Sequence, residues 1–254
     1  YLGATNALPT TTALTLNNAD LYLNGQAQTL ASISGSGNFS VQNGSTNAAT
    51  LTLGSGNTTS TFSGTIKDNG ISVLNTSNSP GTVTGTVALT KIGTGTLTLS
   101  GNNTYTGATT LSAGTLKAGS ATGISSTSTL NATGGVFDLN GYNATVAAVG
   151  VGNAAGTITN SASGSGTNTL SITNLNVAFA PLITDGATTK TAVVMSPGGQ
   201  NTPSFANANN TFSGGLTIGG GSSTRLWQGS VTSTLVNGTL TKSNLGTGTI
   251  YMGA

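Results

Sequence analysis

The chain lacks several residue types on which common active sites and metal centres depend. Its 254 residues include no cysteine and no histidine, and its four acidic residues are all aspartates. Without cysteine there is no disulfide framework and no thiolate metal site. The longest apolar runs, such as residues 192–195, are far too short to span a bilayer, so we expect no membrane insertion of this segment.

Charge of either sign is scarce as well. Charged residues make up 4% of the chain, whereas they are about a quarter of an ordinary globular domain. The six cations are scattered and form no basic run: Lys67, Lys91, Lys117, Lys190, Arg225 and Lys242. A nucleic-acid partner is therefore not expected, because nothing follows a phosphate track. The shortage of straight-chain polar residues also argues against helices, which need them on their wet face.

What the chain does contain is typical of strands and turns. There are 39 glycines, and hydrophobic residues make up 35% of the chain. The hydrophobic residues recur in short alternating strings, as in Leu51-Thr52-Leu53, Leu97-Thr98-Leu99 and Leu170-Ser171-Ile172. Each string places apolar residues on one side and a polar residue on the other, which predicts half-buried strands. Turn signals such as Asn24-Gly25 and Asn140-Gly141 separate them.

The sequence also repeats itself. Leu14 matches Leu130 and Leu23 matches Leu139 at one offset, since 130 − 14 and 139 − 23 are both 116, and we interpret this offset as a superperiod of several coils. An aromatic turn recurs around Phe62, Tyr105 and Phe212. Stacking like residues on one another would fill a narrow interior with aliphatic ladders. We therefore expect an all-β fold, one continuous β-solenoid over residues 1–254, with coils of roughly 20–25 residues.

Two segments have their own predictions. Residues 196–210, which contain Pro197 and Pro203, are predicted to form a loop or excursion from the solenoid. Both ends of the chain lie inside the strand-and-turn pattern, which predicts a fragment or processed piece of something longer. Neither end shows a polar, charged or helical cap.

Residues 91–119, KIGTGTLTLSGNNTYTGATTLSAGTLKAG, closely resemble the passenger-associated transport repeat of bacterial autotransporter passengers. The segments around Phe62 and Phe212 look like degenerate copies. The resemblance implies a right-handed parallel β-helix that is secreted or lies on the outer surface of a Gram-negative bacterium. It also implies a structural or translocation-assisting role, and the motif carries no catalytic residue to transfer.

Direct inspection of the acidic residues also gives no active site. Parallel β-helix enzymes that act on polysaccharides use paired or clustered carboxylates. Asp20 and Asp138 lie on the outward side of related strands but are 138 − 20 = 118 residues apart, which places them several coils from each other. We interpret them as plain solvated strand residues. No catalytic, cofactor-binding or metal-binding residue is predicted, and the chain is not expected to be an enzyme.

Three hypotheses about function follow. The first is a non-catalytic structural solenoid outside the cell, serving as stalk, scaffold or coat. The second is an extracellular filament in which the chain is its own partner, because a solenoid without caps exposes strand edges at its ends. The third is an adhesin that binds a cell-surface glycan or matrix, with Tyr22 and Trp227 as the candidate glycan contacts because both lie outward or near turns.

Overall fold

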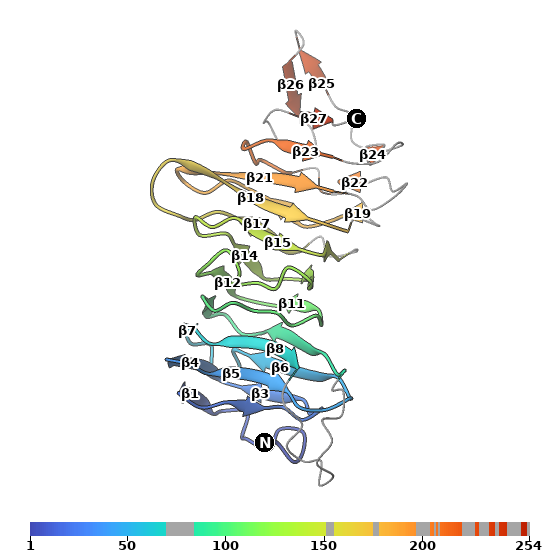
Figure 1. Cartoon of the computed structure of the whole chain (residues 1–254). Coiled ribbons are helices and arrows are strands. Elements are labelled where there is room, and N and C mark those ends of the chain that lie inside the picture. The colour runs from blue at the N-terminus through green and yellow to red at the C-terminus, as the bar shows by residue number, and fades with distance from the viewer. Residues whose placement is uncertain are drawn as a thin grey trace.

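The computed structural model is a column of short β-strands wound coil upon coil (Figure 1). It describes residues 1–69, 84–150, 155–174, 178–196, 204–205, 207, 209–219, 227–228, 234–236, 239–242 and 250–252. Within these ranges there is no helix. Strands of successive coils pair in parallel, and the exception among the described strands is the antiparallel pair β25 (Thr234–Val236) and β26 (Thr239–Lys242). The predicted all-β parallel solenoid is confirmed.

The longest wall of the column, here called wall A, is an eight-stranded sheet with one strand from each successive coil. Its strands are β1 (Ala13–Asn17), β4 (Ser32–Ser36), β7 (Ser60–Phe62), β10 (Thr96–Leu99), β12 (Thr115–Ala118), β14 (Val136–Asp138), β17 (Thr157–Thr159) and β20 (Leu182–Ile183). The coil between paired residues varies in length, from 116 − 97 = 19 residues for Leu97 and Leu116 to 99 − 62 = 37 for Phe62 and Leu99.

Two further walls complete the coils. Wall B begins as a three-stranded sheet of β2 (Leu21–Tyr22), β5 (Ser40–Asn43) and β8 (Thr65–Asn69). Wall C is a six-stranded sheet of β3 (Gln28–Leu30), β6 (Ala49–Leu53), β9 (Val87–Lys91), β11 (Thr109–Leu111), β13 (Thr129–Ala132) and β16 (Ala148–Val149).

Two other parallel sheets continue the column toward the C-terminus. One contains β15 (Ala144–Val146), β18 (Gly166–Ile172), β21 (Thr189–Met195), β23 (Leu216–Ile218) and β27 (Ile250–Met252). The other contains β19 (Ala178–Phe179), β22 (Ser204–Phe205) and β24 (Trp227–Gln228). Part of the predicted 196–210 excursion is thus strand, because β22 pairs with β19. Residues 197–203 lie outside the described residues.

The coils that contain β10 to β13 differ from the rest, and the column narrows there (Figure 1). Residues 100–108 and 119–128 carry no strand, so these coils have strands in walls A and C and none in wall B. We call residues 96–132 the waist. Shorter coils of 19 residues leave no length for a third strand.

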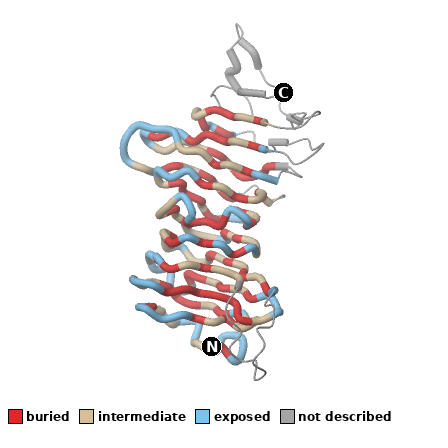
Figure 2. The backbone as a smooth tube through the Cα atoms, viewed as in Figure 1, coloured by how far each residue is buried: buried red, intermediate tan, exposed pale blue. Residues whose placement is uncertain are grey.

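A continuous column of apolar side chains fills the interior, as the buried residues in Figure 2 show. Along wall A, Leu97 pairs with Leu116, and the same inward row goes on through Phe137, Ile158 and Ile183, all nearly or fully buried. The alternation predicted from the sequence holds, since Thr98 between Leu97 and Leu99 is only half-buried. Burial of each such side chain stabilises the fold by about 1.5–3 kcal/mol.

The predicted 116-residue superperiod is wrong. Leu14 lies in β1 of wall A, whereas Leu130 lies in β13 of wall C, so the matched residues do not stack. The physical reason is that coil length varies from 19 to 37 residues, so a fixed offset does not return the chain to the same wall. The turn signals were sounder: Asn24 and Gly25 both adopt positive φ, at 52° and 74°.

Candidate functional site

Two turns of the chain dock on the preceding coil through matching contacts. In the first, the Ile66 backbone N–H donates to Asn103 Oδ1 at 2.7 Å, and the Thr104 N–H donates to the Ile66 carbonyl at 2.9 Å. In the second, the Ile183 N–H donates to Asn210 Oδ1 at 2.8 Å, and the Thr211 N–H donates to the Ile183 carbonyl at 2.9 Å. An asparagine amide thus replaces a backbone acceptor where no strand continues the ladder.

A carboxylate two residues after each isoleucine completes the docking. Asp68 Oδ2 accepts the Thr106 N–H at 2.9 Å and the Thr106 hydroxyl at 2.6 Å. Asp185 accepts the Ser213 N–H at 3.1 Å and the Ser213 hydroxyl at 2.6 Å. Hydrogen bonds to an ionised acceptor are stronger than neutral ones. We call each pair, Asp68 with Thr106 and Asp185 with Ser213, an aspartate clamp.

Each clamp also reaches a third segment of its neighbourhood. Asp68 Oδ1 accepts the Val87 N–H at 2.7 Å, and Asp185 Oδ1 accepts the Thr191 N–H at 2.7 Å. The glycine that ends each turn then bonds to the carbonyl of that same residue: Gly107 N–H to Val87 at 3.1 Å, and Gly214 N–H to Thr191 at 3.0 Å. Two stretches of sequence more than a hundred residues apart therefore build one local structure.

The aromatic residue of each clamped turn, Tyr105 or Phe212, is fully buried. The Tyr105 hydroxyl is 2.7 Å from the Thr109 hydroxyl, which in turn is 2.9 Å from that of Ser128. Burial raises the pKa of Tyr105 to about 12, against which the bond to Thr109 works.

The third aromatic turn predicted from the sequence, around Phe62, is built differently. Phe62 belongs to strand β7 of wall A, and the Ser63 hydroxyl donates to the Gly35 carbonyl at 2.9 Å rather than to a carboxylate.

Asp20 and Asp138 also join successive coils. Asp20 Oδ1 accepts the Ser40 N–H at 2.7 Å and its hydroxyl at 2.8 Å. Asp138 accepts the Ser161 N–H at 2.8 Å and also its hydroxyl, and Lys117 Nζ lies 3.6 Å from it. The prediction of plain solvated residues was wrong, most clearly for Asp138, which is 4% exposed. Sequence reasoning missed the signal that each aspartate has a serine or threonine at the facing point of the next coil.

Lys91 occupies the corner where wall C turns toward wall A at the start of the waist. It is 1% exposed, and its Nζ donates to the carbonyls of Ile92 at 2.6 Å and Gly93 at 2.9 Å. Desolvation lowers the pKa of this ammonium group. Gly114 in the next coil is needed for this packing, since a Cβ there would lie 2.8 Å from Nζ and the backbone has a φ of 64°.

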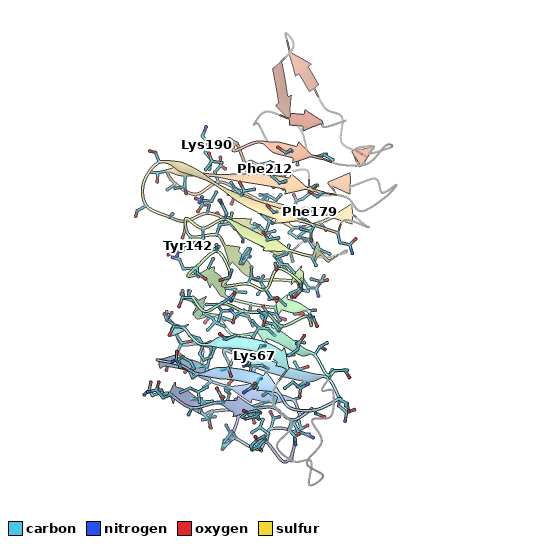
Figure 3. The ribbon with its side chains drawn as sticks, in the orientation of Figure 1. Lys67, Tyr142, Phe179, Lys190 and Phe212 are labelled. Carbon is cyan, nitrogen blue, oxygen red and sulfur yellow. The ribbon has the colours of Figure 1, made fainter. Side chains whose placement is uncertain are left out.

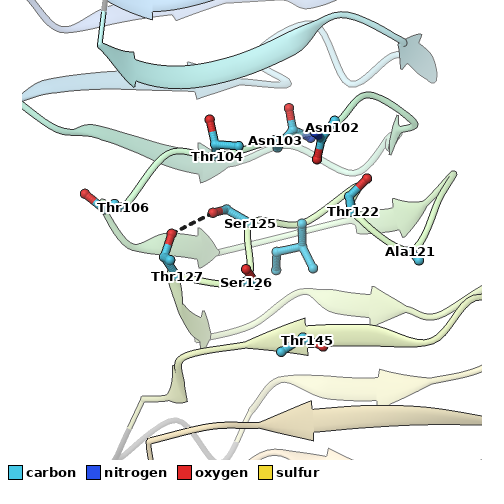
Figure 4. Close-up of a pocket in the computed structure, with 11 residues that line it drawn as sticks. Asn102, Asn103, Thr104, Thr106, Ala121, Thr122, Ser125, Ser126, Thr127 and Thr145 are labelled. Carbon is cyan, nitrogen blue, oxygen red and sulfur yellow. Dashed lines mark hydrogen bonds between the residues drawn. The ribbon is translucent and has the colours of Figure 1, made fainter.

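A shallow depression of about 250 Å³ opens beside the first clamped turn, where the waist lacks a wall B strand (Figure 4). Asn102, Thr104 and Thr106 border it on one side, and residues 121–127 of the next coil on the other. Its lining as described consists of hydroxyl, amide and small apolar side chains. Ser125 and Thr127 bond to each other across 2.9 Å.

The two candidate glycan contacts lie far apart. Tyr22, in β2 of the first coil, is half-buried and stacks on Tyr1 with ring centroids 4.4 Å apart. Burial, followed by the nearby Tyr1 and Asp20, raises the pKa of Tyr22. Trp227 lies in β24, in another sheet toward the opposite end of the column, and its side chain is outside the described residues.

The described part of the chain contains no group of three or more acidic residues placed to hold a metal ion. In the same residues, no helix is long and apolar enough to cross a membrane.

Comparison with known proteins gives one match, and it coincides with the clamped turns. Residues 89–118 and 204–222 match the passenger-associated-transport-repeat family. No curated protein and no solved structure matches the chain significantly. The first matched segment contains the turn at Tyr105 and the second the turn at Phe212. With the parallel solenoid, these matches confirm the resemblance to autotransporter passengers that residues 91–119 suggested.

Proposed function

We propose that this passenger-type β-solenoid is a non-catalytic structural segment, a stalk or scaffold held outside a Gram-negative bacterium. The observation that supports this role is the use of the four carboxylates: Asp20, Asp68, Asp138 and Asp185 each take up donors of a neighbouring coil. A carboxylate engaged in this way is a connector between coils.

The same contacts favour a rigid column. Backbone ladders hold the coils together along walls A and C, and the clamps tie the coils together where a ladder stops. Because most of the wet surface is hydroxyl and amide, neighbouring coils meet little charge repulsion. A stalk needs both properties, since it must stay extended without a second chain to brace it.

A double-mutant cycle tests the structural part of the proposal. Asp68→Ala is expected to lower the free energy of unfolding by about 2–3 kcal/mol, because the N–H groups of Val87 and Thr106 lose their acceptor. Thr106→Val, which removes only the hydroxyl, is expected to cost less, and the double variant less than the sum. Additive effects in urea titrations would contradict a direct clamp.

Two further experiments test location and the absence of catalysis. Antibody should label intact cells that produce the parent protein, and labelling restricted to lysed cells would reject the surface location. Degradation of a polysaccharide panel should not be detected. If it is detected, and a folded variant with all four aspartates changed to asparagine loses it, the chain is an enzyme.

The filament hypothesis stays a prediction, and one structural feature weighs against it. The N-terminal segment folds across the end of the column, where the Leu2 N–H donates to Tyr22 at 2.9 Å and the Asn6 N–H to Ala27 at 2.8 Å. The expectation that this end has no cap is therefore wrong for walls B and C. Negative-stain microscopy separates the alternatives, since long fibres would support end-to-end stacking and monodisperse short rods would reject it.

A further inference from the structure

We propose that the outward face of β2, β5 and β8 binds a short acidic oligosaccharide. This inference goes beyond the structural role and does not depend on it. The face is unusual in the molecule because it combines aromatic, amide, carboxylate and ammonium groups, whereas the other outward rows of the described walls consist mainly of threonine and serine.

Strand register sets the arrangement of these groups. Leu21, Val41 and Ile66 stack in the interior, so the residues after them form an outward row of Tyr22, Gln42 and Lys67. Neighbouring strands are about 4.8 Å apart, which places the two ends of this row about 10 Å from each other. Tyr1 extends the aromatic end of the row by stacking on Tyr22 with an interplanar angle of 23°.

A second outward row, formed by Asp20, Ser40 and Thr65, lies beside the first. Ser40 pairs with Thr65 across β5 and β8. Gln42 is 3% exposed, and its amide donates to Asp20 Oδ2 at 3.1 Å. Together with the two bonds from Ser40, this buried amide fixes the orientation of a carboxylate that is itself exposed. The polar groups are thus held in place before any ligand arrives, which reduces the entropy lost on binding.

An open depression of about 400 Å³ lies on the same face, within the usual size range of ligand sites. Asp20, Asn38, Ser63, Thr65 and Lys67 supply its polar lining, with Phe39 below them. Figure 3 labels Lys67 on this wall. Among the described residues Lys67 has no ion-pair partner, because the one ion pair found there joins Lys117 and Asp138.

The chemistry of these groups favours one class of ligand. An ammonium group attracts a carboxylate, whereas carboxylate, amide and hydroxyl groups bind the hydroxyls of a sugar. The tyrosine pair offers an apolar ring face with a polar tip, on which a sugar ring can lie. A single free cation is too little for a nucleic acid. An oligosaccharide that carries a carboxylate matches all of these groups along the 10 Å row.

The test uses the whole chain with three defined sugars in calorimetric titration: trigalacturonate and sialyllactose as acidic probes, and maltotriose as a neutral one. At least one acidic probe should bind, and more tightly than maltotriose. Lys67→Gln and Tyr22→Ala should each weaken that binding at least tenfold. Matched controls remove the same groups elsewhere: Lys190→Gln at an exposed lysine of β21 and Tyr142→Ala at a tyrosine that is 40% exposed, both labelled in Figure 3.

The outcomes separate cleanly. Loss of binding in the two site variants, with the controls unchanged and all thermal melts preserved, supports the site. If Tyr22→Ala unfolds the first coil, Lys67→Glu replaces it, and charge reversal should abolish binding of the acidic probe. No binding of any probe, binding that survives Lys67→Glu, or equal losses in the control variants would overturn the proposal.

Discussion

The first three coils and the waist solve the same problem in different ways. In the first three coils, strands β2, β5 and β8 close wall B with a backbone ladder. In the waist, wall B has no strand, and side chains take over. Asn103 bridges the Ile66 N–H and the Gly123 carbonyl, each at 2.7 Å, and hydroxyls of Tyr105, Thr109 and Ser128 form a buried chain.

The difference shows what the transport repeat encodes. The matched residues 89–118 cover β9 to β12 and include the turn that replaces the wall B strand. Its polar residues supply specific acceptors where the ladder ends, so a short coil closes without leaving backbone groups unsatisfied. Any loss of these side chains should therefore harm the waist more than a comparable change harms the first three coils.

The largest expected effect tests whether the interior column is continuous through both regions. Leu97→Asp in the waist and Leu51→Asp in the first coils should each cost about 3–5 kcal/mol, because an unpaired charge enters the core. The neighbouring Thr98→Ala should cost less than about 1 kcal/mol. Chemical denaturation measures all three, and similar losses at positions 97 and 98 would mean that the strand parity is wrong.

The next effect is specific to the waist. Asn103→Ala should lower the free energy of unfolding by about 2–3 kcal/mol, since the Ile66 N–H and the Gly123 carbonyl are left buried without partners. Asn102, the preceding residue, is exposed and gives the matched control, with a cost for Asn102→Ala below about 0.5 kcal/mol. Equal thermal melts of the two variants would show that the amide does not replace the strand.

A third effect depends on pH. Folding raises the pKa of Tyr105 from 10.0 to about 12, so the unfolded chain loses this proton first and stability falls as pH rises through that window. Between pH 9 and pH 11 wild type should lose about 1.4 kcal/mol more than Tyr105→Phe. Urea titrations at the two pH values measure this, and parallel losses would place the hydroxyl in contact with solvent.

The smallest effect lies at the junction of the two regions. Burial lowers the pKa of Lys91 below its usual 10.5, so the unfolded chain holds this proton to higher pH than the folded chain does. The penalty for burying the ammonium is present at neutral pH and disappears as pH rises past 10.5. Relative to Lys91→Met, wild type should gain stability over that rise, and a relative loss would contradict the burial.

The sequence allowed the strands and their buried faces to be predicted, because alternation at period two depends only on local residues, as at Leu97, Thr98 and Leu99. It did not allow the stacking to be predicted. Leu14 and Leu130 look equivalent, but coils of unequal length carry them to different walls. The clamps were missed for a related reason: Asp68 and Thr106 are 106 − 68 = 38 residues apart, and Asp185 and Ser213 are 213 − 185 = 28 apart.

That inequality has a consequence for how such a column can grow. Each clamp fixes the start of a coil against the one before it, whatever length of chain lies between its two partners. An insertion between them would leave the docking contacts in place and project from the side of the rod. The clamped turn thus gives the fold sites where foreign segments can be carried while the axis keeps its pitch.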